Sequence, residues 1–202
     1  MLLGWFVGAA WASGRVAVGV SGASGLSPVE PSWAPAGARP AAVGCVGAVG
    51  WWVTGGHDYA GPRGEVLRTS DDTRWGLVAD LCPTSSVGGS GGTSGGGMGA
   101  YGRQWGGQLY LAATLAAGVS AYGKSGPAGQ TYAAFGPVAK PALALGLALP
   151  PGLSIEAGPY AWIAPPLLQG AGLARPRGAF VGHVGLEATF LVGAASPQAP
   201  WR

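Results

Sequence analysis

The sequence predicts an all-β protein, a closed antiparallel transmembrane β-barrel of about eight strands, with short turns on one side and longer Gly/Pro-rich loops on the other. Three observations lead to this prediction. Long segments alternate between apolar and polar or small residues, charged residues make up only 9% of the chain, and Gly and Trp are abundant. Bacterial single-chain barrels use even numbers of strands, which is why we expect eight.

The segment 179–193, AFVGHVGLEATFLVG, shows the most regular alternation. Every second residue from Phe180 to Val192 is apolar or glycine, and His183 and Glu187 lie on the opposite face. A period of two is typical of a strand whose faces meet different environments. Strands of soluble domains usually have about five or six residues, whereas a membrane-crossing strand needs about nine to eleven. The length of the alternation therefore indicates a strand that crosses a membrane.

The composition supports a barrel over other classes. The 40 glycines and 17 prolines disfavour helices, and the 9 tryptophans and 6 tyrosines suit the interfaces of a bilayer. The net charge is +3, but no basic cluster exists, and the closest basic pair is Arg175 and Arg177. This spacing is too sparse for a surface that follows phosphates, so we expect no nucleic-acid partner.

The chain is expected to form one domain, with the barrel over residues 15–193 and a C-terminal tail at 194–202. Segment 1–14 has a short apolar core but lacks the basic residues of a signal peptide, so it is either an atypical signal segment or a first strand. Cys45 and Cys82 lie in separate candidate strands and form either a disulfide or a pair of buried thiols. Their spacing is not that of a zinc site.

In the first half, segments 15–24 and 42–54 alternate as strands. Segments 65–69 and 74–82 are either one interrupted strand or two short ones. The Gly/Ser-rich segment 85–99 has low complexity and predicts a mobile loop.

In the second half, segment 103–122 alternates as one strand, with Leu109 to Val119 apolar on one face. Segment 131–149 carries a row of leucines and is followed by Pro150-Pro151-Gly152, which predicts a tight turn into a strand at 153–162. Together with 179–193, and with 65–82 counted as one strand, the segments of both halves make seven strands. The eighth comes either from segment 1–14 or from a division of 131–149 near its prolines.

Two runs of the sequence carry a family resemblance. GPRGEVLRTS…WGLVADLCP and LALGLALPPGLSIEAG, with a final strand that ends in Phe190, resemble uncharacterised small outer-membrane barrel proteins of high-GC Gram-negative bacteria. The resemblance implies a location in the outer membrane, with the lipid bilayer and the barrel-assembly machinery as partners. In such proteins the assembly machinery usually recognises an aromatic residue at the end of the last strand. The resemblance specifies no external partner.

The segment GVSAYGKS matches the pattern of a phosphate-binding loop through Gly118, Gly123, Lys124 and Ser125. Such a loop needs a helix that begins at its Lys and Ser, because the helix amides hold the phosphates. Gly126-Pro127 follows instead. We interpret the match as accidental and expect no cofactor.

The acid–base residues of the last two strands raise an enzyme hypothesis. His183 and Glu187 share one face, near Glu156 and Tyr160 of the preceding strand. Residues four apart on a strand are roughly 13 Å apart, too far for a direct dyad. The favoured interpretation is a polar network inside a narrow barrel. An enzyme barrel that acts on envelope lipid or peptide is the alternative, and with His57 as the chain's other histidine we expect no histidine metal site.

A second alternative is a polytopic helical membrane protein, because segment 104–123 is uncharged and long enough to span a bilayer as a helix. Its glycines and the even spacing of its polar residues favour a strand. Candidates for the membrane interface are Trp51, Trp52, Trp105, Tyr160 and Trp162. The interior of an eight-stranded barrel is just wide enough for its own side chains. The predicted function is therefore structural or partner-binding, through the external loops, with small-solute passage as a minor possibility.

Overall fold

A computed structural model describes residues 15–27, 41–55, 58–60, 66–68, 71–85, 92–106, 108–125, 131–149, 153–165, 168–169 and 181–193. The expectations for segments 1–14 and 194–202 lie outside these residues, as do His57, Arg175 and Arg177.

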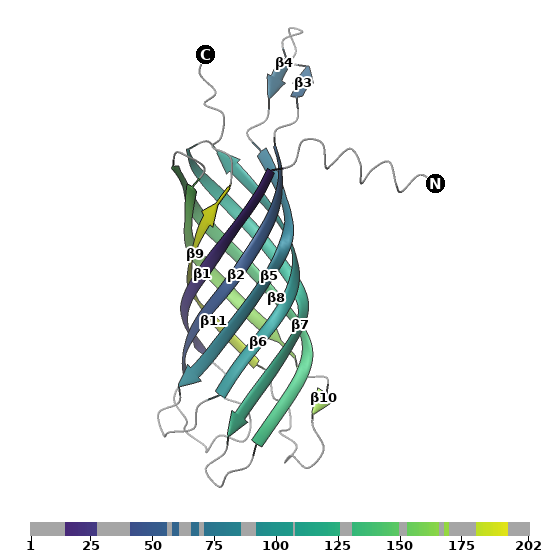
Figure 1. Ribbon diagram of the computed structural model, residues 1–202, viewed down its shortest axis with the longest axis vertical. Helices are drawn as coiled ribbons and strands as arrows, with labels where there is room; N and C mark the ends of the chain where they lie inside the picture. The colour runs from purple at the N-terminus through teal and green to yellow at the C-terminus, as the bar shows by residue number, and fades with distance from the viewer. Residues whose placement is uncertain are drawn as a thin grey trace, which may run out of the picture.

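Eight long strands form a closed antiparallel barrel (Figure 1). They are β1 Arg15–Ser27, β2 Ala41–Gly55, β5 Asp71–Ser85, β6 Gly92–Gly106, β7 Leu109–Ser125, β8 Thr131–Leu149, β9 Leu153–Ala164 and β11 Val181–Val192. Each pairs with its neighbour along the chain, and β11 also pairs with β1, which closes the ring. A barrel leaves no strand edge unpaired, as lipid requires. The predicted fold class is confirmed.

Three short strands accompany the barrel. β3 Asp58–Ala60 and β4 Val66–Arg68 pair with each other in the connection between β2 and β5. β10 Leu168–Gln169 pairs with the first part of β8. The segments 65–69 and 74–82 therefore contribute to different elements, because only β5 joins the barrel wall.

The barrel is apolar outside, and its buried charged side chains point inside together with aromatic and small apolar ones. Leu186 on β11 is 67% exposed, whereas the inward-facing Asp80 on β5 is 6% exposed. This distribution is the reverse of a soluble barrel and fits an outer surface that contacts acyl chains. Other large exposed apolar side chains are Val18, Val20, Leu77, Leu81, Leu115, Val119, Leu143, Leu145 and Phe190.

The two ends of the barrel differ. β1 begins and β11 ends at the upper end in Figure 1, where residues 107–108 and 150–152 join consecutive strands. We call this the turn end. β1 ends and β2 begins at the opposite end, where β9 also ends and β11 begins, and we call this the loop end. The predicted asymmetry is present, with the exception of connection 56–70 at the turn end, which carries β3 and β4.

The eighth strand comes from a segment for which the sequence predicts a loop. Residues 92–99 are the first part of β6, and the predicted single strand 103–122 is divided between β6 and β7 at 107–108. The prediction is wrong because glycine content alone does not decide the structure: β6 is paired along its length to both β5 and β7. Its inward-facing Ser94 and Met98 are 1% and 3% exposed.

Strand β8 is continuous, so the suggested division of segment 131–149 is also wrong. Pro137 and Pro141 both face outward and keep the register with β7. Proline cannot donate a backbone hydrogen bond, and the β8–β9 pairing passes from Ala139 to Ala142 without a pair at Pro141.

The structure also decides against the helical alternative and corrects one expectation about the aromatic residues. Among the described residues there is no helix with the length and apolar character needed to cross a bilayer. The helical alternative fails because segment 104–123 is extended in β6 and β7. Of the candidate interface aromatics, Trp52 and Trp105 face outward, but Trp51, Tyr160 and Trp162 are only 4%, 4% and 1% exposed. They fill the interior, because they lie on the inward-facing parity of β2 and β9.

Candidate functional site: the polar interior

The first polar cluster lies in the barrel interior near the turn end. Arg74 of β5 forms an ion pair with Glu156 of β9. The side chain of Arg74 is 2% exposed and that of Glu156 is 9% exposed. Tyr110 of β7 donates a hydrogen bond of 2.8 Å to the same carboxylate oxygen. The guanidinium group also lies 4.9 Å from the ring centroid of Trp51 and 3.5 Å from the hydroxyl oxygen of Thr114. We call these residues the Arg74 cluster.

The second cluster lies farther from the turn end. Lys140 of β8 donates hydrogen bonds of 2.8 Å to Asp80 of β5 and of 2.8 Å to Glu187 of β11. Its ammonium nitrogen also lies 5.4 Å from the ring centroid of Tyr160. Lys140, Asp80 and Glu187 form the Lys140 cluster, in which one cation joins three strands around the lumen.

Both clusters meet the requirement that a charge removed from water must have a partner. The Arg74 cluster connects β5 with β9, and the Lys140 cluster connects β8 with β5 and β11. None of these ion pairs joins strands that are adjacent in the barrel. The clusters therefore cross the lumen rather than follow its wall.

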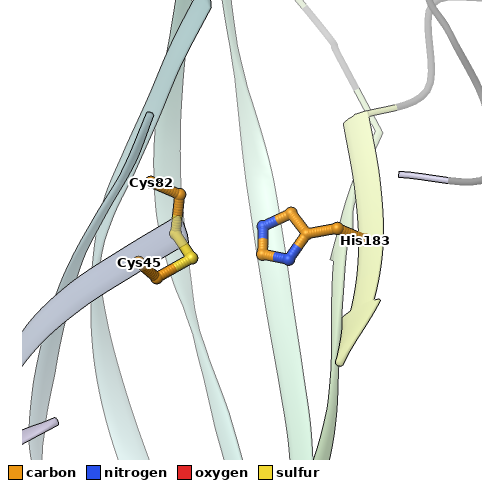
Figure 2. Close-up of side chains that lie close together, drawn as sticks. All are labelled: Cys45, Cys82 and His183. Atoms are coloured by element: carbon orange, nitrogen blue, oxygen red, sulfur yellow. A yellow bond between two sulfur atoms is a disulfide. The ribbon is translucent and has the colours of Figure 1, made fainter. Parts of the chain in front are cut away.

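A third cluster lies toward the loop end (Figure 2). Cys45 of β2 and Cys82 of β5 form a disulfide, which resolves the alternatives left open by the sequence. His183 of β11 faces this disulfide from across the lumen (Figure 2). Its ring stacks on Trp162 at 5.5 Å between centroids, and its Nδ1 atom lies 3.1 Å from the Tyr160 hydroxyl. We call Cys45, Cys82, His183, Tyr160 and Trp162 the Cys–His cluster.

The residues of the enzyme hypothesis have separate partners. Glu156 pairs with Arg74, Glu187 pairs with Lys140, and His183 contacts Tyr160. They share the interior face, as their position on the strands predicts, but each is held in a different cluster. This arrangement favours the interpretation of a packed polar network over a catalytic one.

The phosphate-loop pattern adopts a different structure. Gly118, Gly123, Lys124 and Ser125 all lie in β7, which is extended and paired with β6 and β8. An extended strand does not turn its successive amides toward one anion, as a phosphate-binding loop does.

Sequence reasoning did not select three residues that organise the interior: Arg74, Asp80 and Lys140. The sequence does indicate them, because inward-facing and outward-facing residues alternate along each strand. Arg74 and Asp80 alternate with Trp75, Leu77 and the other outward residues of β5, so both must point inward. A charged residue that faces the lumen of a narrow barrel needs an ionic partner, and this requirement identifies it.

The space that remains between the clusters is small. A cavity of about 50 Å³ lies between the Arg74 and Lys140 clusters and is lined by Thr114, Lys140, Glu156 and Glu187 among others. A second space of about 20 Å³ lies beside Arg74 and Asp72 near the turn end. One water needs at least about 10–15 Å³ of such volume, so the first cavity holds about three or four waters and the second about one.

No family model matches the chain, and no curated protein matches it. Among solved structures, the chain is similar to the crystal structure of Ail, the attachment invasion locus protein of Yersinia pestis, in complex with the heparin analogue sucrose octasulfate. The match covers 89% of this chain and 99% of the Ail chain, at 14% sequence identity and a TM-score of 0.43. An identity and a score of this size say nothing about what the present chain binds.

Proposed function

We propose that this protein is a structural or partner-binding barrel of the Gram-negative outer membrane that acts through its loops rather than through its lumen. The observation that carries the proposal is the filled interior. Two ion-pair clusters cross the lumen, and the cavity between them has a volume of only about 50 Å³. That space accommodates only about three or four water molecules.

The aromatic side chains narrow the lumen further. Trp162 extends from β9 toward β6, where a Cβ atom added at Gly96 would lie 3.1 Å from its ring. The indole therefore occupies lumen space between β9 and β6. Small-solute passage is therefore the weaker hypothesis, and the partner must be met at the ends of the barrel.

The loop end is the candidate contact surface. In outer-membrane barrels the short turns face the periplasm and the longer loops face the exterior. Connections 28–40 and 165–180 contain Arg39, Arg175 and Arg177 against a single acidic residue, Glu30. This excess of positive charge supports an anionic external partner, because complementary charge steers association. Assembly by the barrel-assembly machinery and contact with the bilayer belong to the same proposal.

Two measurements test this function. The barrel reconstituted into planar bilayers should give no stepwise conductance under conditions in which a general porin does. Proteoliposomes should be retained on dextran sulfate but not on neutral dextran. The triple variant R39Q/R175Q/R177Q should lose this retention, whereas R103Q, a change on the outer wall, should keep it. Porin-like conductance, or retention that ignores the triple substitution, would contradict the proposal.

A further inference from the structure

The Cys–His cluster brings together three groups that can bind a metal. Cys45, Cys82 and His183 each offer a ligand atom, and these atoms lie within 4.8 Å of one another. The residues come from β2, β5 and β11 and are 7%, 0% and 2% exposed. Three strands therefore direct sulfur and nitrogen atoms to one buried point, although the spacing in the sequence gives no metal-binding motif.

The two contacts of Tyr160 are both satisfied by one tautomer of His183. The Tyr160 hydroxyl lies 3.8 Å from the sulfur of Cys45 and 3.1 Å from Nδ1 of His183. A disulfide sulfur carries no hydrogen, so both contacts are hydrogen bonds only if Tyr160 donates to Cys45 and the Nδ1–H of His183 donates to Tyr160. The lone pair of the imidazole is then on Nε2.

The Nε2 atom of His183 has no hydrogen-bond partner among the residues that the structure describes, and it is buried. The ring directs a nitrogen toward the disulfide (Figure 2) and is held in plane by stacking on Trp162 at 10°. A buried acceptor without a donor is costly and calls for an explanation. In the disulfide form this nitrogen stays without a partner among the described residues, and it is the atom that faces the two sulfurs once they are reduced.

We propose that reduction of the Cys45–Cys82 disulfide creates a site for a thiophilic divalent cation of the Zn²⁺ type, bound by both thiolates and by Nε2 of His183. A dithiol supplies the two electrons and two protons of the reduction and leaves as its own cyclic disulfide. Binding of the cation then releases one proton from each cysteine. The disulfide form does not bind the metal, because the ligand is the thiolate.

The charge and the distances suit this cation. Two thiolates neutralise a divalent ion, so the complex adds no net charge to the low-dielectric interior, whereas a monovalent ion would leave a buried negative charge. Zinc–sulfur and zinc–nitrogen bonds of about 2.3 and 2.0 Å place tetrahedral ligand atoms about 3.5–3.8 Å apart. The imidazole need move by only about an ångström once the sulfurs separate. Tyr160 then serves as the outer hydrogen-bond partner that orients a metal-binding histidine.

The test uses the untagged full chain, folded in detergent micelles in its oxidised form and then reduced with a dithiol. Cd²⁺ is the probe, because thiolate-to-cadmium charge transfer absorbs in the ultraviolet, and Zn²⁺ is used as the competitor. The reduced protein should bind one equivalent of Cd²⁺ that Zn²⁺ displaces, and the oxidised protein should bind none at this site. H183A should weaken binding at least tenfold, and C45S/C82S should abolish it.

The chain offers a matched control in its other histidine. H57A should bind Cd²⁺ as the unchanged protein does, and heat-modifiable gel migration identifies the samples that are folded. If H183A does not fold, H183Q provides a variant of similar size. Equal Cd²⁺ binding by the reduced protein and C45S/C82S, or by the reduced protein and the His183 variants, overturns the proposal. A barrel that loses its fold on reduction overturns it too, because the site then never forms.

Discussion

The buried ion pair between Arg74 and Glu156 provides a quantitative test of the interior. Replacing Arg74 with Met keeps most of the side-chain volume and removes the charge. Glu156 then keeps the hydrogen bond of 2.8 Å from the Tyr110 hydroxyl but has lost its cation. Removing one partner of a buried ion pair costs about 3–5 kcal/mol, because the other charge stays buried without compensation. We expect R74M to lower the free energy of unfolding by an amount in this range.

The expected cost arises from the unpaired charge, and a double-mutant cycle isolates it. Both side chains are almost fully buried, at 2% and 9% exposure, so solvent screens the pair little. In R74M/E156Q no charge remains at the site. The double variant should therefore be less destabilised than the sum of R74M and E156Q, with a coupling of about 1–3 kcal/mol, as found for residues in direct contact.

Equilibrium urea unfolding in lipid vesicles, followed by tryptophan fluorescence, measures each variant. R103M is the control, because Arg103 faces outward and lies 5.9 Å from the ring centroid of Trp105. Exposed interactions of this kind contribute at most about 1 kcal/mol. If R74M lowers the free energy of unfolding no more than R103M does, or if the cycle shows no coupling energy, the ion pair does not stabilise the barrel.

Two further predictions concern the wall. G146A should destabilise the barrel by about 1–3 kcal/mol, because the added Cβ would overlap the ring of Tyr110, whereas G50A meets nothing within 4 Å and should be neutral. L186R, in the middle of β11, should lower the free energy of unfolding by about 2–4 kcal/mol. L109R, at the first residue of β7, should lower it by about 1 kcal/mol or less, because arginine is tolerated near the membrane interface. Both side chains are 67% exposed, so urea unfolding in vesicles that shows equal costs would refute the assignment of membrane depth.

Much of the wall could be predicted from the sequence because a strand encodes its two faces by parity alone. In β9 and β11 the alternation of residue types is enough to place Glu156, His183 and Glu187 on the inward face, where the structure has them. The same rule extends to Arg74 and Lys140. Parity specifies that these side chains enter the lumen, and the narrow lumen requires that they find partners there.

The pairing of these residues could not be predicted, because it depends on the stagger between strands that are not adjacent. Arg74 and Glu156 are 82 positions apart, and Cys45 and Cys82 are 37 apart. A shift of a single position in any strand pairing between them would reverse the face of a side chain or move it to another level. The position of a residue along its strand therefore determines whether it faces inward. Its partner across the lumen depends on the registers of all the strand pairs in between.

In the glycine-rich strand β6, the rule that glycine-rich segments form loops is wrong. Packing across the lumen of the closed barrel decides the structure of this segment instead. In a closed barrel of eight strands the lumen has a fixed cross-section, so a large side chain on one wall requires a small residue on the facing wall. Trp162 enters from β9 and approaches the inward position Gly96 on β6, where an added Cβ would lie 2.8 Å from the Val119 carbonyl oxygen and 3.1 Å from the indole. A leucine at Gly96 would suit a strand by propensity and would collide with the indole. The glycines that predicted a loop are thus, at this position, a packing complement to a tryptophan from a strand far along the chain.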